Sequence, residues 1–383
     1  MKKIVIAADS FKGSVRSIEV AEYVEQGIKS VFPECEVRKV YIADGGEGTV
    51  EALVSSLNGK YVEVNVHDPL MRPVVATYGI LEEGTVAVLE MASASGLTLL
   101  KPEERNPLKT TTYGTGEMMA DALQRGCRKL LVGIGGSATN DGGTGMLSAL
   151  GFRFYSKEGN ELKGGGEILS RIASIDNRYV MEELANAEIT VACDVTNPFS
   201  GPDGAAYVYA PQKGADSCMV EELDRGLKHF ADVIKTYNGI DVELIPGAGA
   251  AGGLGGGFAA LLGARLVSGI EMVLETIRFR EIIRSADLII TGEGKLDLQT
   301  AMGKAPRGVL DAAALQGIPV IAIGGSVENT GMLNEQGFAG VFSIQPGPVT
   351  LEKAMEHDYT CRQIVRTVSQ LMLFVGKMKP LIK

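Results

Sequence analysis

The sequence predicts a two-domain α/β protein. Its N- and C-terminal segments are expected to share one Rossmann-like, parallel, three-layer sheet domain, and a second mixed α/β domain is expected to be inserted between them. At both ends of the chain, short apolar runs alternate with helix-length segments, as in buried parallel strands covered by helices. In the middle, closely spaced strands follow one another without helices. The expected domains are residues 1–65 with 285–383, and residues 66–284.

The length and charge of the chain limit its class. At roughly 150 residues per domain, 383 residues fit two domains. The net charge of −10 argues against nucleic acid or an anionic membrane surface as a partner, although lysines and backbone N–H groups can still hold a small anionic substrate. The 49 glycines gather at the ends of apolar runs, which indicates close backbone approaches.

Cysteine usage and hydropathy predict a cytoplasmic protein without a membrane span. The five cysteines are scattered and include no CxxC pair, so neither a disulfide framework nor a zinc ribbon is expected. The first apolar run ends at Asp9 and is too short for a signal peptide. Residues 244–264 carry no charge, but Pro246 and eight glycines argue against a membrane helix there.

The first sixty residues repeat the order strand, loop, helix. The expected strands are KKIVIAAD at the start and residues 37–42, and the expected helices are residues 17–32 and 49–57. Both loops carry carboxylates: Asp9 in the first, and Asp44 with Glu47 in the second. Ligands of open α/β sheets bind at the carboxyl ends of the strands, so both loops are candidates for a site.

The next segment predicts an antiparallel meander and then a Gly-rich turn. Three alternating strands are expected at residues 62–66, 74–80 and 86–89, followed by a helix at 110–125 and a buried strand at 129–134. That strand opens into GGSATNDGG and a short helix at 146–150. Such a turn before a helix N-terminus favours an anion, although an ordinary tight turn rich in Asn and Asp is the alternative.

The remainder returns to alternation after a loop-rich stretch. Residues 151–215 are expected to be mostly loops around a strand at 189–193, and the 3–4 apolar spacing of residues 218–237 predicts an amphipathic helix. The last hundred residues predict three strands and two helices. The strands are expected at 287–290, 319–323 and 338–344, and the helices at 303–316 and 361–374.

Glycine motifs leave a nucleotide cofactor open as an alternative. No GxxxxGK[ST] sequence occurs. A GxGxxG sequence does occur at Gly247, Gly249 and Gly252, after the strand-like residues 242–245 and about 20 residues before Glu271, as a dinucleotide site requires. In so glycine-rich a chain this match is weak, and an NAD-linked oxidoreductase is retained only as a second hypothesis.

Carboxylates in Gly-rich loops point to a different chemistry. A single such residue is usually a helix cap or turn former, but here the pattern recurs in several loops, at Asp9, Asp44 with Glu47, Asp141, Asp194, and Glu293 with Asp297. Convergent carboxylates suit Mg²⁺ and supply a base for a hydroxyl nucleophile, as phosphoryl transfer requires. Lysines in the same loops either neutralise anionic substrates or are solvated surface residues: Lys12, Lys213, Lys295 and Lys304.

Seven motifs in order resemble those of the type I bacterial glycerate kinase family. They are ADSFKGS, ADGGEGT, GIGGSATNDGG, CDVTNPFSGPDGA, PQKGAD, PGAGAAGGLGGG and TGEGKLDLQTAMGKAP, and the resemblance runs beyond residue 325. Departures are mild: Ala8 stands where proline is common, and Leu298 and Ala301–Met302 vary. The resemblance implies Mg²⁺-dependent transfer of the γ-phosphoryl group of ATP to D-glycerate, giving 2-phosphoglycerate, in a cleft between two domains.

Loop position, residue type and the resemblance together give a set of expected roles. We expect catalytic roles for Asp9, Asp44, Asp194 and Lys295, and glycerate binding by Ser10, Lys12, Glu47 and Lys213. Nucleotide or phosphate binding is expected at Gly135, Gly136, Ser137, Asn140, Asp141, Gly249, Gly252 and Lys304, and Mg²⁺ binding at Glu293 and Asp297. Open at this point are which Gly-rich loop holds ATP, the 2- or 3-hydroxyl as acceptor, a monomer or homodimer, and a non-catalytic sensor of nucleotide or acid.

Overall fold

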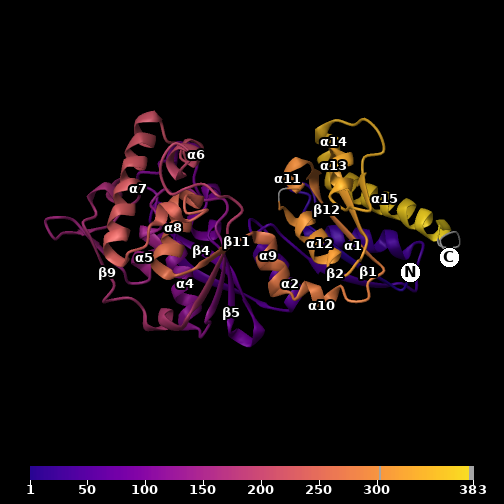
Figure 1. Cartoon of the computed structure of the whole chain (residues 1–383), viewed down its shortest axis with the longest axis horizontal. Coiled ribbons are helices and arrows are strands. Elements are labelled where there is room, and N and C mark those ends of the chain that lie inside the picture. The colour runs from indigo at the N-terminus through magenta and orange to yellow at the C-terminus, as the bar shows by residue number, and fades with distance from the viewer. Residues whose placement is uncertain (302, 379–383) are drawn as a thin grey trace. The chain divides into compact units, whose positions relative to one another are not determined.

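The computed structural model describes residues 1–301 and 303–378 and divides the chain into two compact units (Figure 1). The first unit is discontinuous: it combines residues 1–44 and 51–56 with the chain from Val273 onward. The second unit consists of Gly45–Val50 and Leu57–Met272. The fold is therefore α/β, with one unit built from both terminal segments and the other inserted, as the sequence predicted. Met302, which belongs to the last motif, lies outside the described residues.

The first unit contains a five-stranded sheet in which all pairs are parallel. The strand order is β14-β13-β12-β1-β2. The bounds are β1 Lys3–Ala8, β2 Glu36–Tyr41, β12 Leu288–Leu296, β13 Val320–Val327 and β14 Gly340–Ser343. Strand β1 is an inner strand, since Ile4 pairs with Val37 on one side and Leu288 on the other. The N-terminal strand is thus held by a strand almost three hundred residues away.

Helices cover both faces of this sheet. Ile4 and Ile6 pack in one core cluster with residues of α1 and α15, whereas Val5 and Ala7 are equally buried but lie outside that cluster. Because side chains alternate along a strand, the second pair faces the opposite side, where α12 contacts β1 and β12. The helices of this unit are α1 Ser17–Lys29, α10 Phe279–Ile282, α11 Leu298–Ala301, α12 Ala305–Ala314, α13 Thr330–Glu335, α14 Leu351–Met355 and α15 His357–Met378. Most of α2 Thr49–Leu57 also belongs to it, although the first two residues and the last residue of that helix belong to the second unit.

The second unit contains a six-stranded mixed sheet in the order β11-β10-β6-β5-β4-β3. The bounds are β3 Lys60–His67, β4 Pro73–Leu81, β5 Val86–Glu90, β6 Lys129–Gly133, β10 Glu188–Ala192 and β11 Arg265–Val267. Strands β3, β4 and β5 pair antiparallel, which confirms the predicted meander. From β5 to β11 every pair is parallel. The predicted Gly-rich turn therefore follows a buried parallel strand, β6.

Helices and a small sheet complete the second unit. The helices are α3 Ala92–Ser95, α4 Tyr113–Gln124, α5 Thr144–Ala149, α6 Ala205–Tyr209, α7 Ser217–Asn238 and α8 Ala250–Leu262, with α9 Gly269–Thr276 running from this unit into the first. Short 3-10 helices lie at Glu82–Gly84, Leu97–Leu99, Pro102–Glu104, Gly166–Arg171, Glu182–Asn186, Pro211–Lys213 and Val242–Leu244. Within the predicted loop-rich stretch, β7 Arg153–Tyr155, β8 Glu161–Leu162 and β9 Ser174–Asp176 form a three-stranded sheet.

Two details differ from the expectations. Strands β12 and β13 stay paired beyond their apolar cores, with Glu293 opposite Gly324 and Lys295 opposite Ser326. Glu293 and Lys295 therefore lie on a strand rather than in the loop predicted after Ile290. The strand-like residues before Gly247 form a 3-10 helix, so the GxGxxG sequence follows no strand and the dinucleotide interpretation is wrong. Among the described residues, no helix is long and apolar enough to cross a membrane.

Candidate active site

Asp9 lies directly after β1 and is almost fully buried. Its backbone N–H donates to the carbonyl of Gly292 on β12 at 2.8 Å, and its carboxylate accepts from the backbone N–H of Ser10 at 2.6 Å. Only 3% of the residue is exposed. Burial, reinforced by the negative charge of Asp44, raises the pKa of Asp9 to about 7. A carboxyl group with such a pKa is well matched to proton transfer near neutral pH.

Lys12 and Asp44 form an ion pair beside Asp9. The Nζ atom of Lys12 is 2.6 Å from Oδ2 of Asp44, and the lysine side chain is largely exposed. Partial burial lowers the pKa of Lys12, but the hydrogen bond and the charge of Asp44 outweigh this effect and raise it. Lys12 is therefore a permanent cation in this cluster, able to hold an anion through the exposed part of its ammonium group.

Glu293 and Lys295 enter the same region from β12. Glu293 is 8% exposed and accepts a hydrogen bond from the Thr300 hydroxyl at 2.6 Å. Burial raises the pKa of Glu293, with Thr300 and the charge of Lys304 acting in the opposite direction. Lys295 Nζ lies 3.3 Å from Asp297 and 3.1 Å from Glu328, on the more exposed side. Alternate positions of β12 thus place a carboxylate and a lysine on one face of the strand, near its carboxyl end.

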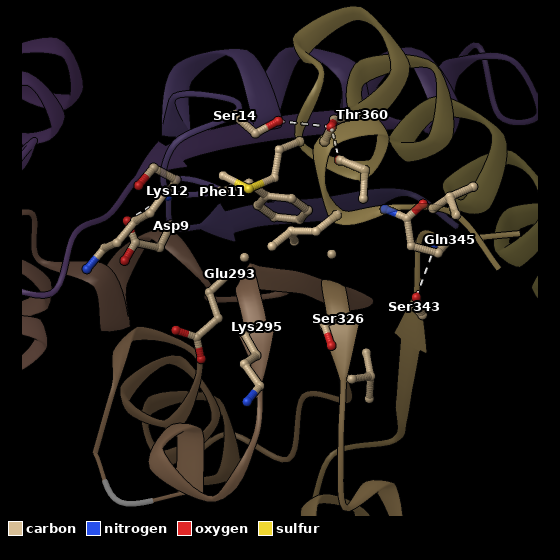
Figure 2. A pocket seen from close by; sticks show the side chains of 18 of the residues that line it. Asp9, Phe11, Lys12, Ser14, Glu293, Lys295, Ser326, Ser343, Gln345 and Thr360 are labelled. Atoms are coloured by element: carbon tan, nitrogen blue, oxygen red, sulfur yellow. Dashed lines mark hydrogen bonds between the residues drawn. The ribbon is translucent and has the colours of Figure 1, made fainter. Parts of the chain in front are cut away.

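Asp9, Lys12, Glu293 and Lys295 line a cavity of about 770 Å³ in the first unit (Figure 2). Of the residues predicted from the sequence, the cavity contains Asp9, Ser10, Lys12, Glu293, Lys295 and Lys304. Sequence reasoning missed the rest of the wall, which includes Phe11, Ser326, Ser343, Gln345 and Met355. The position of Ser326 after Gly324–Gly325, near the end of a predicted strand, was a usable signal. Nothing in the local sequence distinguishes Gln345.

The carboxylate oxygens of Glu293 and Asp297 are of the kind that binds a magnesium ion. Glu293 and Asp297, the predicted ligands, are connected through Thr300, whose hydroxyl donates to Glu293 and accepts from the backbone N–H of Asp297 at 3.0 Å. No group of three or more His, Cys, Asp or Glu side chains positioned for a metal occurs within residues 1–301 and 303–378. Mg²⁺ commonly uses only one or two protein carboxylates and completes its shell with water and phosphate oxygens.

The second unit holds another polar cluster, around Lys213. This lysine is 1% exposed, and its Nζ donates to the Ser137 hydroxyl at 2.7 Å and to the carbonyl of Thr139 at 2.6 Å. Burial lowers the pKa of Lys213 to about 7, against the charge of Asp141. Asn140 is fully buried, and both polar atoms of its side chain have no hydrogen-bond partner among the described residues. Lys213 thus fixes the turn that follows β6.

Asp141 holds the same turn from the inside. Its carboxylate accepts hydrogen bonds from the backbone N–H and the hydroxyl of Thr112, both at 2.8 Å. It also accepts from the N–H groups of Gly143 at 3.1 Å and Gly145 at 3.2 Å. Burial raises the pKa of Asp141, and these four hydrogen bonds oppose that rise. The geometry gives Asp141 a bracing role, and its predicted contact with phosphate stays a prediction.

The glycines predicted to bind phosphate fall into two kinds. A Cβ atom on Gly249 would lie 2.1 Å from the carbonyl of Pro198, and one on Gly252 would lie 2.1 Å from that of Thr139. Gly252 also has a φ of +74° and accepts a hydrogen bond from Gly142 N–H at 3.0 Å. Backbone packing alone therefore requires these two glycines. Gly135 and Gly136 are exposed, and their loop remains available to a ligand.

Two further predicted residues lie apart from the Lys213 cluster within the second unit. Asp194 follows β10, is exposed, and accepts a hydrogen bond from the N–H of Gly269 at 2.9 Å. Glu47 is exposed, and its charge adds to burial in raising the pKa of Glu90. Most of the other predicted side chains fall into two groups. The first unit gathers Asp9, Ser10, Lys12, Asp44, Glu293, Lys295, Asp297 and Lys304, and the second unit gathers Ser137, Asn140, Asp141 and Lys213.

Comparison with known proteins gives a consistent result. A model of the glycerate kinase family matches residues 4–375. The chain is 48% identical to a glycerate kinase of Bacillus subtilis, over 96% of this chain and 97% of that protein. It is 45% identical to the glycerate 2-kinase of Escherichia coli K12, over 94% and 95%. A crystal structure from Salmonella typhimurium LT2, assigned as a glycerate kinase 2, superposes with a TM-score of 0.91 at 43% identity and covers 99% of both chains. The chain belongs to the glycerate kinase family of enzymes.

Proposed function

We propose that this enzyme transfers the γ-phosphoryl group of ATP to the 2-hydroxyl of D-glycerate, with Mg²⁺, giving 2-phosphoglycerate. The observation that carries the proposal is the cluster in the first unit, where a buried carboxyl group with a pKa of about 7 lies beside Lys12 and Asp44. The name of the Escherichia coli relative, glycerate 2-kinase, supports the position of transfer. We further propose a cytoplasmic enzyme that acts as a monomer or homodimer without nucleic-acid or membrane partners.

In this proposal Asp9 is the general base. The glycerate hydroxyl oxygen attacks the γ-phosphorus, its proton passes to the Asp9 carboxylate, and the bond from phosphorus to the ADP oxygen breaks. Lys12, Lys295 and Lys304 neutralise the phosphate and carboxylate charges of the two substrates. Magnesium, when bound at Glu293 and Asp297, supplies further charge neutralisation at the phosphate oxygens. Asp44 keeps Lys12 oriented through their ion pair.

The second unit contributes binding groups in the same proposal. Ser137 and the exposed backbone of Gly135 and Gly136 offer donors to an anionic ligand, and Lys213 holds Ser137 in place through its 2.7 Å hydrogen bond. Asp194 and Glu47, both exposed, retain their proposed catalytic and glycerate-binding roles. These assignments predict that alanine at Asp194 reduces kcat while leaving the free energy of unfolding almost unchanged.

A phosphorus NMR experiment tests the function directly. Purified enzyme is incubated with MgATP and D-glycerate, and the phosphomonoester resonance is compared with those of authentic 2- and 3-phosphoglycerate. The 2-isomer is the expected product. A 3-isomer would overturn the proposed position of transfer, and the absence of any phosphoester while ATP stays intact would overturn the proposed acceptor. Omitting the metal with a chelator is expected to stop turnover, and the Asp9→Asn variant is the matched catalytic control.

A further inference from the structure

We propose that the cavity of the first unit binds the nucleotide of the phosphoryl donor, and that Gln345 recognises the edge of the purine base. This inference rests on the proposed function, because it names the ligand of a site already assigned to phosphoryl transfer. It differs from the sequence-based expectation that the Gly-rich loops around Gly135 or Gly249 hold the nucleotide. Four features support it: the size of the cavity, its polarity, the unpaired side-chain oxygen of Gln345 and the position of the cavity in the sheet.

The size of the cavity suits a nucleotide. Its volume of about 770 Å³ lies within the range of roughly 300–1,000 Å³ that is usual for cofactor and drug-sized ligands. Glycerate is a three-carbon acid and would occupy a small part of this space, leaving the apolar wall in contact with water. Of the two proposed substrates, the purine nucleoside triphosphate is the one large enough to fill much of this volume.

The polarity of the cavity follows the polarity of a nucleotide. Figure 2 shows Asp9, Lys12 and Glu293 on one side and Ser343 and Gln345 on the other, with the ring of Phe11 between them. The apolar part of the lining also includes Val349, Leu351 and Met355. Phosphates belong at the charged side, where lysines and the proposed metal ligands lie. The base then reaches the side that offers an aromatic ring and an amide.

Gln345 offers an unused polar group at that side. Its Oε1 atom is buried and has no hydrogen-bond partner among the described residues. A carboxamide presents an acceptor and a donor side by side, and turning the group over exchanges them. Figure 2 shows the amide nitrogen of Gln345 on the cavity side and Oε1 turned away from it, so in this orientation Nε2 can donate to a ring nitrogen of adenine. If the carboxamide turns over, Oε1 comes to the cavity and can accept from the adenine amino group, which gives the buried oxygen a partner.

The fold places Gln345 at the end of the sheet where the strands have their carboxyl termini. The residue follows β14, its backbone N–H donates to the Ser343 hydroxyl at 3.1 Å, and the preceding N–H of Ile344 donates to Gly324 of β13 at 2.9 Å. Ligands of open parallel sheets bind at the carboxyl ends of the strands. Asp9 after β1 and Gln345 after β14 both lie at such ends. They are therefore two ends of one ligand site rather than parts of separate sites.

Binding and kinetics of Gln345 variants test this assignment. We expect Gln345→Leu to raise both the Kd of the β,γ-imido analogue of ATP, measured by calorimetry with Mg²⁺, and the KM for ATP by about 10- to 100-fold. The KM for D-glycerate is expected to change by less than about twofold, because only the nucleotide contact is removed. Gln345→Glu accepts only, which suits guanine better than adenine, so it is expected to raise the ratio of GTP to ATP efficiency. Gln336→Leu makes the same substitution at an exposed position of the same unit and is expected to change neither constant.

The outcomes separate the inference from the proposed function. A higher KM for glycerate with unchanged analogue binding would overturn the nucleotide assignment and place the acid acceptor in the cavity, and unchanged values for both substrates would also overturn it. If the wild-type enzyme makes no phosphoglycerate but its binding of the ATP analogue depends on Gln345, the proposed kinase activity is overturned and the proposed nucleotide site is supported. Should the Gln345 variants not fold, hydrogen exchange on the wild type decides, because the analogue must protect amides of residues 343–355 while glycerate alone must not.

Discussion

The carboxyl group of Asp9 has a pKa of about 7 because it is buried beside a second carboxylate, and this makes two measurable predictions. As a general base it must be ionised, so kcat/KM, which reports the free enzyme, is expected to rise with pH through about 7. We expect Asp9→Asn to lower kcat by roughly 10²- to 10⁴-fold and to abolish that rise. A pH–rate profile of both proteins checks this. A variant with wild-type turnover would remove Asp9 from the mechanism.

The same pKa links Asp9 to stability. Because the pKa is raised in the folded state, the folded protein holds this proton more tightly than the unfolded chain does. The corresponding stability is fully present below about pH 4 and is lost as the pH rises to about 7. Asp9→Asn removes this dependence, so the difference in Tm between variant and wild type is expected to shift in favour of the variant as the pH increases across that window. A constant difference in scanning calorimetry would contradict the assignment.

Asp141 is expected to matter for folding more than Asp9 does. Replacing it with alanine leaves the buried donors of Thr112, Gly143 and Gly145 without their acceptor, and we expect a loss of about 2–4 kcal/mol in the free energy of unfolding. Asp232→Ala on the exposed face of α7 is the matched control and is expected to change stability by less than about 0.5 kcal/mol. Urea denaturation of both variants measures the difference. Equal stabilities would show that the hydrogen-bonded carboxylate does not hold the turn.

At the scale of elements, the contact between α1 and α15 depends on Gly27. A Cβ atom there would lie 2.7 Å from Cβ of Val368, so Gly27→Ala is expected to lower stability by about 1–3 kcal/mol although alanine favours helices. Gly331→Ala in α13 meets no atom within 4 Å and is expected to gain up to about 1 kcal/mol. A double-mutant cycle with Val368→Gly tests the contact, since only the loss of the valine Cβ and Cγ1 atoms removes both close approaches. Additive effects would mean that the two helices do not meet at this glycine.

The elements also show how far the sequence alone leads. Apolar periodicity predicted β1, α1 and α7 to within a few residues, because one buried face dominates each of them. It ended β12 too early, since glycine and charged residues from Gly292 onward look like a loop, whereas parallel pairing with β13 continues through them. Tertiary pairing is not a local property of the sequence. For the same reason the carboxylates could be predicted as a group, but Gln345, which the fold brings to the cavity from β14, could not.

At the scale of the whole molecule, the order of the strands ties the first unit to the end of the chain. β1 pairs with β2 on one side, but its other edge is completed by β12, and β13 and β14 extend the sheet from there. The second unit needs none of these strands, since its two sheets are built from residues 60–267. The first unit therefore depends on pairing between strands from the two ends of the chain, whereas the second unit does not. Formation of the first unit must wait for the C-terminal segment.

This division predicts how a shortened chain behaves. In a chain ending at Ala286, we expect the amides of β6 to remain protected from hydrogen exchange, because β5 and β10 still pair with that strand. The amides of β1 are expected to exchange quickly, because β12 is missing and the buried side chains Ile4 and Ile6 lose their neighbours Leu288 and Ile290. The full chain is the control, in which both strands must be protected. Protection of β1 in the shortened chain would mean that the N-terminal strand and its helices fold without the C-terminal segment, and the order of assembly argued from the sheet would be wrong.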